Sequence, residues 1–195
     1  MKVFLIIGYV SRIVWSLPPF RQYKGNFFNY FLIMAMADPV GSFLVWLGYR
    51  NSFSVYTVTA AAALLSIIAL NKNIRWIPAL SFFLFTLAAL IFMPLTEVKL
   101  IAAAILSALI YYFIRHMIIY AGKYGRVCFF HIIFLIYNLS LVFKLLNVAL
   151  EFQKGIPYFY ATTIFDILLG ILFCFFREDD RRFSLKLRKY FIYSS

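Results

Sequence analysis

The sequence predicts an all-α, polytopic membrane protein with seven transmembrane helices, an N-terminus outside and a C-terminus in the cytoplasm. Hydrophobic residues make up 65% of the 195 residues and charged residues only 13%, whereas a soluble domain is about half apolar and about a quarter charged. The apolar residues also run in long stretches separated by short basic loops. These stretches do not alternate with a period of two, so they favour helices over a transmembrane β-barrel.

Seven stretches are candidates for membrane helices. A helix needs about 20 mostly apolar residues to cross a hydrocarbon core about 30 Å thick. The predicted helices cover 3–17, 26–48, 53–71, 75–94, 99–120, 127–149 and 157–177. We therefore expect a seven-helix membrane domain over 1–177 and a basic amphipathic cytoplasmic tail over 178–195.

The first stretch, 3–17, has two interpretations. It is short and is followed by Pro18, so a cleaved signal peptide is the alternative to a membrane helix. The sequence after Ser16 lacks the pattern of small residues that marks a cleavage site, and only Lys2 charges the segment before the apolar run. The loop charges also agree with an odd number of spans, which requires the first stretch to be one of them. We therefore expect a helix that stays in the protein.

The orientation follows from the basic residues, which give the chain a net charge of +12. Cytoplasmic loops of membrane proteins carry an excess of lysine and arginine. The basic loops and ends assigned to the cytoplasm contain Arg21, Lys24, Lys72, Arg75, Arg115, Lys123, Arg126, Arg177, Arg181, Arg182, Lys186, Arg188 and Lys189. The opposite side has only Lys2, Arg50, Lys99 and Lys154. This rule explains the positive charge without nucleic acid, and we expect a multi-pass protein of the plasma or inner membrane.

Small residues single out two of the predicted helices. Ala60 to Ala63 lie in the stretch 53–71, and Ala102 to Ala104 lie in the stretch 99–120. Small side chains let membrane helices approach closely. We expect these two helices to lie at the centre of the bundle.

The tail has aromatic and aliphatic residues at helical spacing among cations. Phe183, Leu187, Tyr190 and Phe191 alternate with arginine and lysine, which is typical of a helix that lies in the membrane interface. The anionic cytoplasmic leaflet would attract it. We expect an interfacial helix over 181–192; the alternative is a disordered basic tail that serves as a topology signal.

Asp38 is the first of three charged residues in the predicted spans that we expect to belong to a polar site. It lies near the middle of its helix and directly before Pro39, which removes a backbone donor and frees a carbonyl of the preceding turn. Freed carbonyls beside a carboxylate suit a cation or proton site. The alternative is a kinked helix in which Asp38 bonds to a neighbour.

Lys144 and Asp166 are the other two, and they fall on consecutive helices. Lys144 belongs to a polar stripe, spaced three and four apart, of Tyr137, Ser140, Lys144, Asn147 and Glu151. Such spacing places the stripe on one helical face. Asp166 shares a face with Thr162 and Gly170. The short connection between the two helices makes them antiparallel neighbours, so Lys144 and Asp166 are expected to form an ion pair, either as a working site or as a packing element.

These polar residues form the predicted ligand-binding site. Its members are Asp38, Tyr137, Ser140, Lys144, Asn147, Thr162 and Asp166. No catalytic residue and no metal site are predicted, because His116 and His131 lie on different helices without nearby cysteine or carboxylate ligands. Arg12 and Arg115 are expected to extend to the interface, and Cys128 and Cys174 to be reduced packing residues.

Two family resemblances were weighed. The segment 17–24, LPPFRQYK, resembles the first helix connection of PQ-loop and SWEET-type sugar carriers, which have seven helices and an outside N-terminus. That family's repeat implies a second such proline between its fifth and sixth helices, where 119–126, IYAGKYGR, has none. Seven helices with an intramembrane lysine are similar to microbial rhodopsins, but there the lysine lies in the seventh helix. Neither resemblance assigns the chain to a family.

Three functional classes remain open. The favoured one is a small carrier or channel-like transporter with an intramembrane polar site. The alternatives are a sensor or receptor-like module that signals through a membrane or cytoplasmic protein partner, and a structural subunit of a membrane complex. An enzyme is the least favoured class, because no nucleophile with a base or metal cluster is evident. The sequence indicates no particular cofactor, and its one firm partner is the lipid bilayer.

Overall fold

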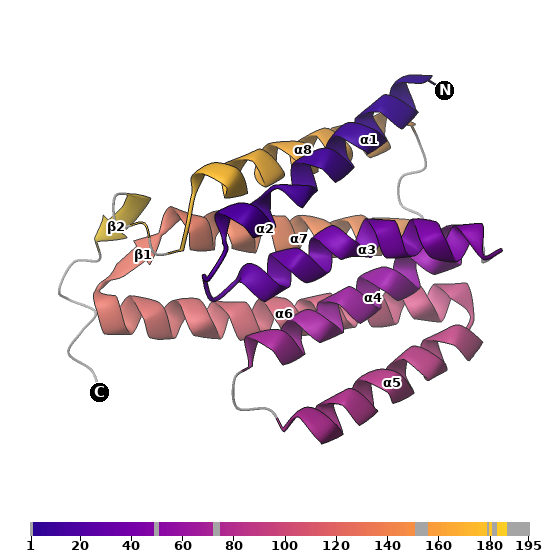
Figure 1. Cartoon of the computed structure of the whole chain (residues 1–195), viewed down its shortest axis with the longest axis horizontal. Helices are drawn as coiled ribbons and strands as arrows, with labels where there is room; N and C mark the ends of the chain where they lie inside the picture. Colours follow the sequence, from indigo (N-terminus) through magenta and orange to yellow (C-terminus); the bar gives the residue numbers. More distant parts are fainter. Residues whose placement is uncertain are drawn as a thin grey trace.

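The computed structural model describes residues 2–48, 51–71, 75–150, 156–178, 180 and 183–186. These residues form a helical bundle with one small sheet (Figure 1). The helices are α1 (Lys2–Ser16), α2 (Pro18–Arg21), α3 (Phe28–Trp46), α4 (Asn51–Leu70), α5 (Trp76–Phe92), α6 (Leu95–Tyr124), α7 (Phe129–Ala149) and α8 (Ile156–Phe175). The strands are β1 (Arg126–Cys128) and β2 (Ser184–Lys186). The helical class is confirmed, and each predicted stretch overlaps one of the seven long helices.

Three helices of the described chain are long and apolar enough to cross a membrane. They cover Phe28–Trp46, Leu95–Tyr124 and Phe129–Asn147. Shorter apolar helices cover Val55–Leu70, Ile77–Phe92 and Tyr160–Phe175. Their length and composition are consistent with membrane association.

Proline and glycine set several helix boundaries. Pro18 and Pro19 begin the single-turn helix α2, where the missing proline N–H would have had no helical partner. Pro94 precedes the first residue of α6. Gly125 ends α6 in the left-handed conformation with φ of 62°, and its N–H donates to the Ala121 carbonyl over 2.8 Å. Helices commonly end at a glycine in this left-handed conformation.

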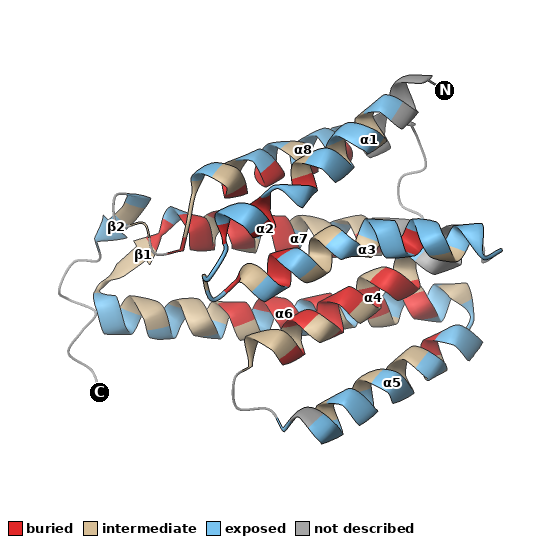
Figure 2. Cartoon of the chain, viewed as in Figure 1, coloured by how far each residue is buried: buried red, intermediate tan, exposed pale blue. Residues whose placement is uncertain are grey.

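The two alanine-rich helices pack closely, as predicted. α4 lies against both α3 and α6, and α6 also packs against α7 (Figure 1). Ala60, Ala63 and Ala102 have no exposed surface. In contrast, α5 packs against α4 at the edge of the bundle and is mostly exposed (Figure 2). The prediction of central positions for the helices at 53–71 and 99–120 is therefore confirmed.

On the other side of the bundle, α1 packs along α8. Their contact depends on Gly170 of α8, because a Cβ atom there would lie 2.8 Å from Val14 Cγ1 and 3.4 Å from the Trp15 ring. A small residue at a helix crossing allows this close approach. The first predicted stretch is thus an integral helix of the described bundle.

Buried aromatic rings fill the interior where α3, α6, α7 and α8 meet. This aromatic cluster comprises Phe27, Tyr30, Phe31, Phe113, Phe130, Phe134 and Phe173. The Phe134 ring lies at its centre, with ring centroids 4.2 Å from Phe113 and 4.6 Å from Tyr30. Tilted and edge-on pairs of this kind add stabilisation beyond simple burial.

The tail departs from the predicted interfacial helix. Ser184–Lys186 is the strand β2, which pairs antiparallel with β1 in the register Val127 to Leu185. The chain turns back after α8, and the Phe183 ring packs edge-on against Phe176 at 4.9 Å. The open backbone groups of β1 thereby gain hydrogen-bond partners. The helix is therefore wrong for 183–186; residues 181, 182 and 187–195 lie outside the described part.

We expect Phe134→Ala to destabilise the bundle more than any surface aromatic substitution. The free energy of unfolding should fall by about 3 kcal/mol, the lower end of the range for Phe-to-Ala changes in cores. The lower end is expected because lipid solvates apolar side chains that lose their packing contacts. Phe85→Ala on α5 is the matched control, since Phe85 is 73% exposed. Unfolding of purified protein in mixed micelles measures both; equal losses would contradict a central role for Phe134.

Candidate functional site

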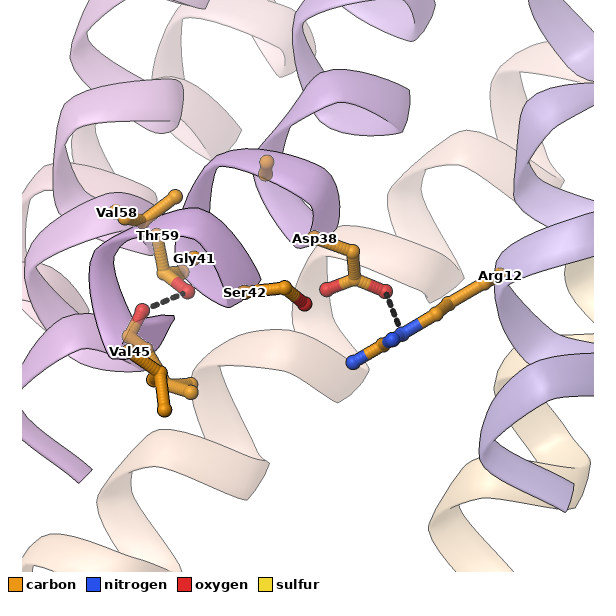
Figure 3. A pocket seen from close by; sticks show the side chains of 9 residues that line it. Arg12, Asp38, Gly41, Ser42, Val45, Val58 and Thr59 are labelled. Atoms are coloured by element: carbon orange, nitrogen blue, oxygen red, sulfur yellow. Dashed lines mark hydrogen bonds and ion pairs between the residues drawn. The ribbon is translucent and has the colours of Figure 1, made fainter. Parts of the chain in front are cut away.

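A polar cavity of about 610 Å³ lies among α1, α3, α4, α7 and α8. Four charged side chains line it, and they come from four different helices. These are Arg12 of α1, Asp38 of α3, Lys144 of α7 and Asp166 of α8. A smaller hollow of about 270 Å³ shares Arg12, Asp38 and Thr59 with it (Figure 3). Charged groups in an apolar bundle are costly unless they are paired, so their convergence marks this cavity as the candidate site.

Lys144 and Asp166 form the predicted ion pair. Lys144 Nζ lies 3.1 Å from Asp166 Oδ2. The Asp166 side chain is only 13% exposed and that of Lys144 32%. The pairing arises because α7 and α8 are neighbours and both residues lie at similar depths from the connection that joins their helices. The predicted contact is confirmed, and it fixes the relative rotation of α7 and α8.

Asp38 has a cationic neighbour that the sequence analysis did not assign to it. Arg12 Nε lies 4.0 Å from Asp38 Oδ2, and Figure 3 shows the guanidinium extending toward the carboxylate. Both side chains are more than half exposed, so their attraction is weaker than that of the Lys144 pair. α3 continues through Pro39. Arg12 therefore lines the cavity, and its extension to the interface stays a prediction.

Four of the seven predicted site residues line the cavity. They are Asp38, Tyr137, Lys144 and Asp166. Ser140, Asn147 and Thr162 are not among the lining residues. The Ser140 hydroxyl donates to the Tyr137 carbonyl over 2.7 Å, and the Thr162 hydroxyl donates to the Tyr158 carbonyl over 3.0 Å. Serine and threonine hydroxyls often bond to carbonyls of their own helix in this way, and the Ser140 side chain is also a hydrogen-bond partner of Asp166 on α8. Glu151 of the predicted polar stripe lies outside the described residues.

Aromatic side chains close one end of the cavity. The Trp15 ring lies 4.4 Å from the Tyr137 ring, and Tyr137 lies 6.0 Å from Phe173 of the aromatic cluster. Trp15 and Tyr137 are both lining residues and both buried. The cavity therefore has charged walls and an aromatic floor. Sequence reasoning missed Trp15 and Arg12, although an intramembrane carboxylate such as Asp38 signals that a cation lies nearby.

A second polar cluster lies at the β1 end of the bundle. His116 Nε2 lies 3.5 Å and His131 Nε2 lies 4.0 Å from the same carboxylate oxygen, Glu178 Oε1. The premise that no carboxylate accompanies these histidines is therefore wrong. Glu178 follows α8, and the turn of the chain toward β2 keeps it near α6 and α7. Periodicity in the sequence could not predict this approach, because it depends on the tertiary path of a loop.

Comparison of the chain with protein-family models, curated proteins and solved structures gave no match. The chemistry of the cavity must therefore be inferred from its own residues. Two cations and two carboxylates make its wall formally neutral overall. Such a wall can bind a solute that carries both charges, or can exchange partners between its own ion pairs.

We expect the Lys144 and Asp166 pair to show strong non-additivity. Lys144→Met should lower the free energy of unfolding by about 3–5 kcal/mol, because it leaves a buried carboxylate without its cation. Asp166→Asn should cost less, since the longer and more exposed Lys144 side chain can move its charge toward water. The double variant K144M/D166L should recover most of the loss.

Unfolding in mixed micelles provides the double-mutant cycle. Lys123→Met is the control, because it makes the same chemical change at an exposed position. Additive losses in the double variant would show that the two side chains do not interact.

Proposed function

We propose that the chain is a seven-span membrane protein that acts as a small carrier or channel-like transporter. The observation that carries this proposal is the cavity in which four charged side chains from four helices meet. A pair such as Lys144 and Asp166 would suffice to hold two helices together. The presence of Arg12 and Asp38 at the same cavity exceeds that structural need, and intramembrane ionisable groups most often mark solute pathways.

The proposed orientation places the N-terminus outside and the C-terminus in the cytoplasm. The excess of basic residues in alternate loops supports it. The arrangement in Figure 1 is compatible with it, since α1 begins at one end of the bundle and β1 and β2 lie at the other. In this orientation the β1 end faces the cytoplasm of a plasma or inner membrane.

The cavity favours a small zwitterionic solute. Binding sites for small molecules usually measure about 300–1,000 Å³, and this one is about 610 Å³. A solute carboxylate would lie against Arg12 or Lys144, and its ammonium against Asp38 or Asp166. Ser11, Ser42 and Thr59 add hydroxyl groups to the wall.

The aromatic floor suggests how such a carrier would prevent leakage. Trp15 and Tyr137 separate the cavity from the aromatic cluster. Passage toward the β1 end would require α1 to move relative to α7. The ion pairs that bridge α1 to α3 and α7 to α8 could exchange partners with a bound solute during that movement.

The topology can be tested with reporter fusions. Reporters placed after Ser195 and at Asn51 should lie on opposite sides of the membrane. Seven proposed spans precede Ser195, an odd number, whereas two precede Asn51, an even number. A dual reporter that is active on only one side measures this directly. Fusions that report the same side would contradict the seven-span arrangement.

Solute binding can be followed through Trp15. In a W46F/W76F background Trp15 is the remaining tryptophan, and zwitterionic solutes should change its fluorescence. The same solutes should enter liposomes that contain the protein. Asp38→Asn should lower uptake by at least about tenfold, equivalent to about 1.4 kcal/mol of lost interaction, whereas Glu97→Gln, a matched change at an exposed residue, should not.

The outcomes separate the proposed classes. Binding with uptake supports a carrier. Binding without uptake contradicts transport and favours the sensor or receptor-like module. Neither binding nor uptake across a panel of zwitterions, cations and anions would favour a structural subunit of a membrane complex.

A further inference from the structure

His116, His131 and Glu178 bring three metal-binding groups together from three separate segments. His116 lies on α6, His131 lies on α7, and Glu178 lies just after α8. One ligand atom of each residue lies within 4.8 Å of those of the other two. Histidine nitrogen and carboxylate oxygen are common ligands of first-row transition metals.

The histidine ring nitrogens lack ordinary partners. His131 is fully buried, and neither of its ring nitrogens has a hydrogen-bond partner among the described residues. His116 Nε2 is also buried without one. Buried polar atoms normally have partners, and leaving them without any costs free energy. A metal ion among these nitrogens would satisfy them.

The carboxylate is oriented toward the two histidines. Asn26 Nδ2 donates to Glu178 Oε2 over 3.0 Å, which leaves Oε1 directed to the two imidazoles. Outer hydrogen bonds of this kind hold a metal ligand in position.

The spacing matches an ion better than a set of direct bonds. A charge-assisted hydrogen bond measures about 2.7–2.9 Å, and both contacts to Glu178 Oε1 are longer, at 3.5 and 4.0 Å. Two ligands of a tetrahedral Zn²⁺ ion, each about 2.0–2.1 Å from the metal, lie about 3.4 Å apart. The pair of His116 and Glu178 already has this separation, whereas His131 Nε2, at 4.0 Å from Glu178 Oε1, must move inward to bind the same ion.

We propose that His116, His131 and Glu178 bind a divalent first-row transition-metal ion, with Zn²⁺ as the best match. Two histidines and a glutamate leave a fourth position for water or a small anion. A cavity of about 430 Å³ reaches His116 and Glu178, and Lys123 and Arg126 also line it. This cavity gives the ion a route of entry and gives its fourth position access to solvent.

The proposed metal site is separate from the charged cavity. His131 and Lys144 lie on the same helix, and their separation of 13 positions in sequence corresponds to about 20 Å along the helix axis. The aromatic cluster lies between them, since Phe134 contacts Phe113 and Tyr30 in that interval. Metal binding therefore stands or fails independently of solute transport.

Metal binding is tested on the full chain purified with an affinity tag that contains no histidine. The protein is stripped with a chelator and then dialysed against buffered micromolar Zn²⁺. We expect one Zn²⁺ per chain and a higher unfolding temperature in the presence of Zn²⁺. Co²⁺ in the same site should give the intense visible absorption of a four-coordinate ion rather than the weak bands of a six-coordinate one.

His116→Gln and Glu178→Gln remove single ligands with little change of shape. Both should lose the stoichiometric Zn²⁺, and Asn26→Ala should weaken binding by about 10- to 100-fold, the range for residues that orient a ligand. Glu97→Gln is the control and should bind like the unchanged chain. The metal-free unfolding temperature of each variant shows whether it is folded.

Two results would overturn the proposal. One is less than stoichiometric Zn²⁺ on the unchanged chain, which would leave the cluster as a histidine–glutamate ion-pair network. The other is undiminished binding by folded His116→Gln and Glu178→Gln, which would place the ion elsewhere. A six-coordinate Co²⁺ spectrum lost in both variants would retain the site but replace Zn²⁺ by a metal of higher coordination, such as Fe²⁺.

Discussion

The ring of Phe134 is the packing contact on which the bundle depends. It touches rings from α3, α6 and α8 as well as Phe130 of its own helix. Lipid tails are as apolar as these rings, so membrane helices gain little from burial itself and depend on close contact and internal polar bonds. A large ring that meets three other helices at once supplies such contact. It also divides the interior into a charged cavity on one side and a histidine cluster on the other.

Helix α7 carries a polar group to each level of this interior, and a different element provides each partner. Lys144 meets Asp166 of α8, Asn138 accepts from the Tyr30 hydroxyl of α3 over 3.2 Å, and His131 faces Glu178 after α8. In a low-dielectric interior each such contact is strong when complete and costly when incomplete. The three partners therefore determine both the rotation and the depth of α7. Apolar packing alone would leave several rotations of nearly equal energy.

The sequence predicted the parts of this arrangement that depend on one helix or on one short connection. Helix number and position followed from the lengths of the apolar stretches, judged against the about 20 residues that a membrane-spanning helix needs. The pairing of Lys144 with Asp166 followed from equal depth on helices joined by a short connection. The contact between Arg12 and Asp38 could not be predicted, because it depends on the rotation of α1 relative to α3, and the prolines between the two helices leave that rotation open. The prediction of a helix in the tail was wrong at 183–186 for a related reason. Helical spacing favoured a helix at Phe183, whereas the unpaired backbone of β1 offered a strand partner.

The position of Glu178 follows from two contacts far apart in sequence. Gln22 is buried, and its Nε2 donates to the carbonyls of Phe173 and Phe176 over 3.2 and 2.8 Å. The last carbonyls of a helix have no partner within it, so Gln22 satisfies the end of α8 at the level where the chain turns. Just beyond, the pairing of β2 with β1 holds the tail beside the connection between α6 and α7. A carboxylate that leaves α8 between these two restraints must lie near both histidine-bearing helices. The same geometry that ends α8 therefore assembles the histidine–glutamate cluster, and an ion bound there would fasten α6, α7 and the tail at a single point.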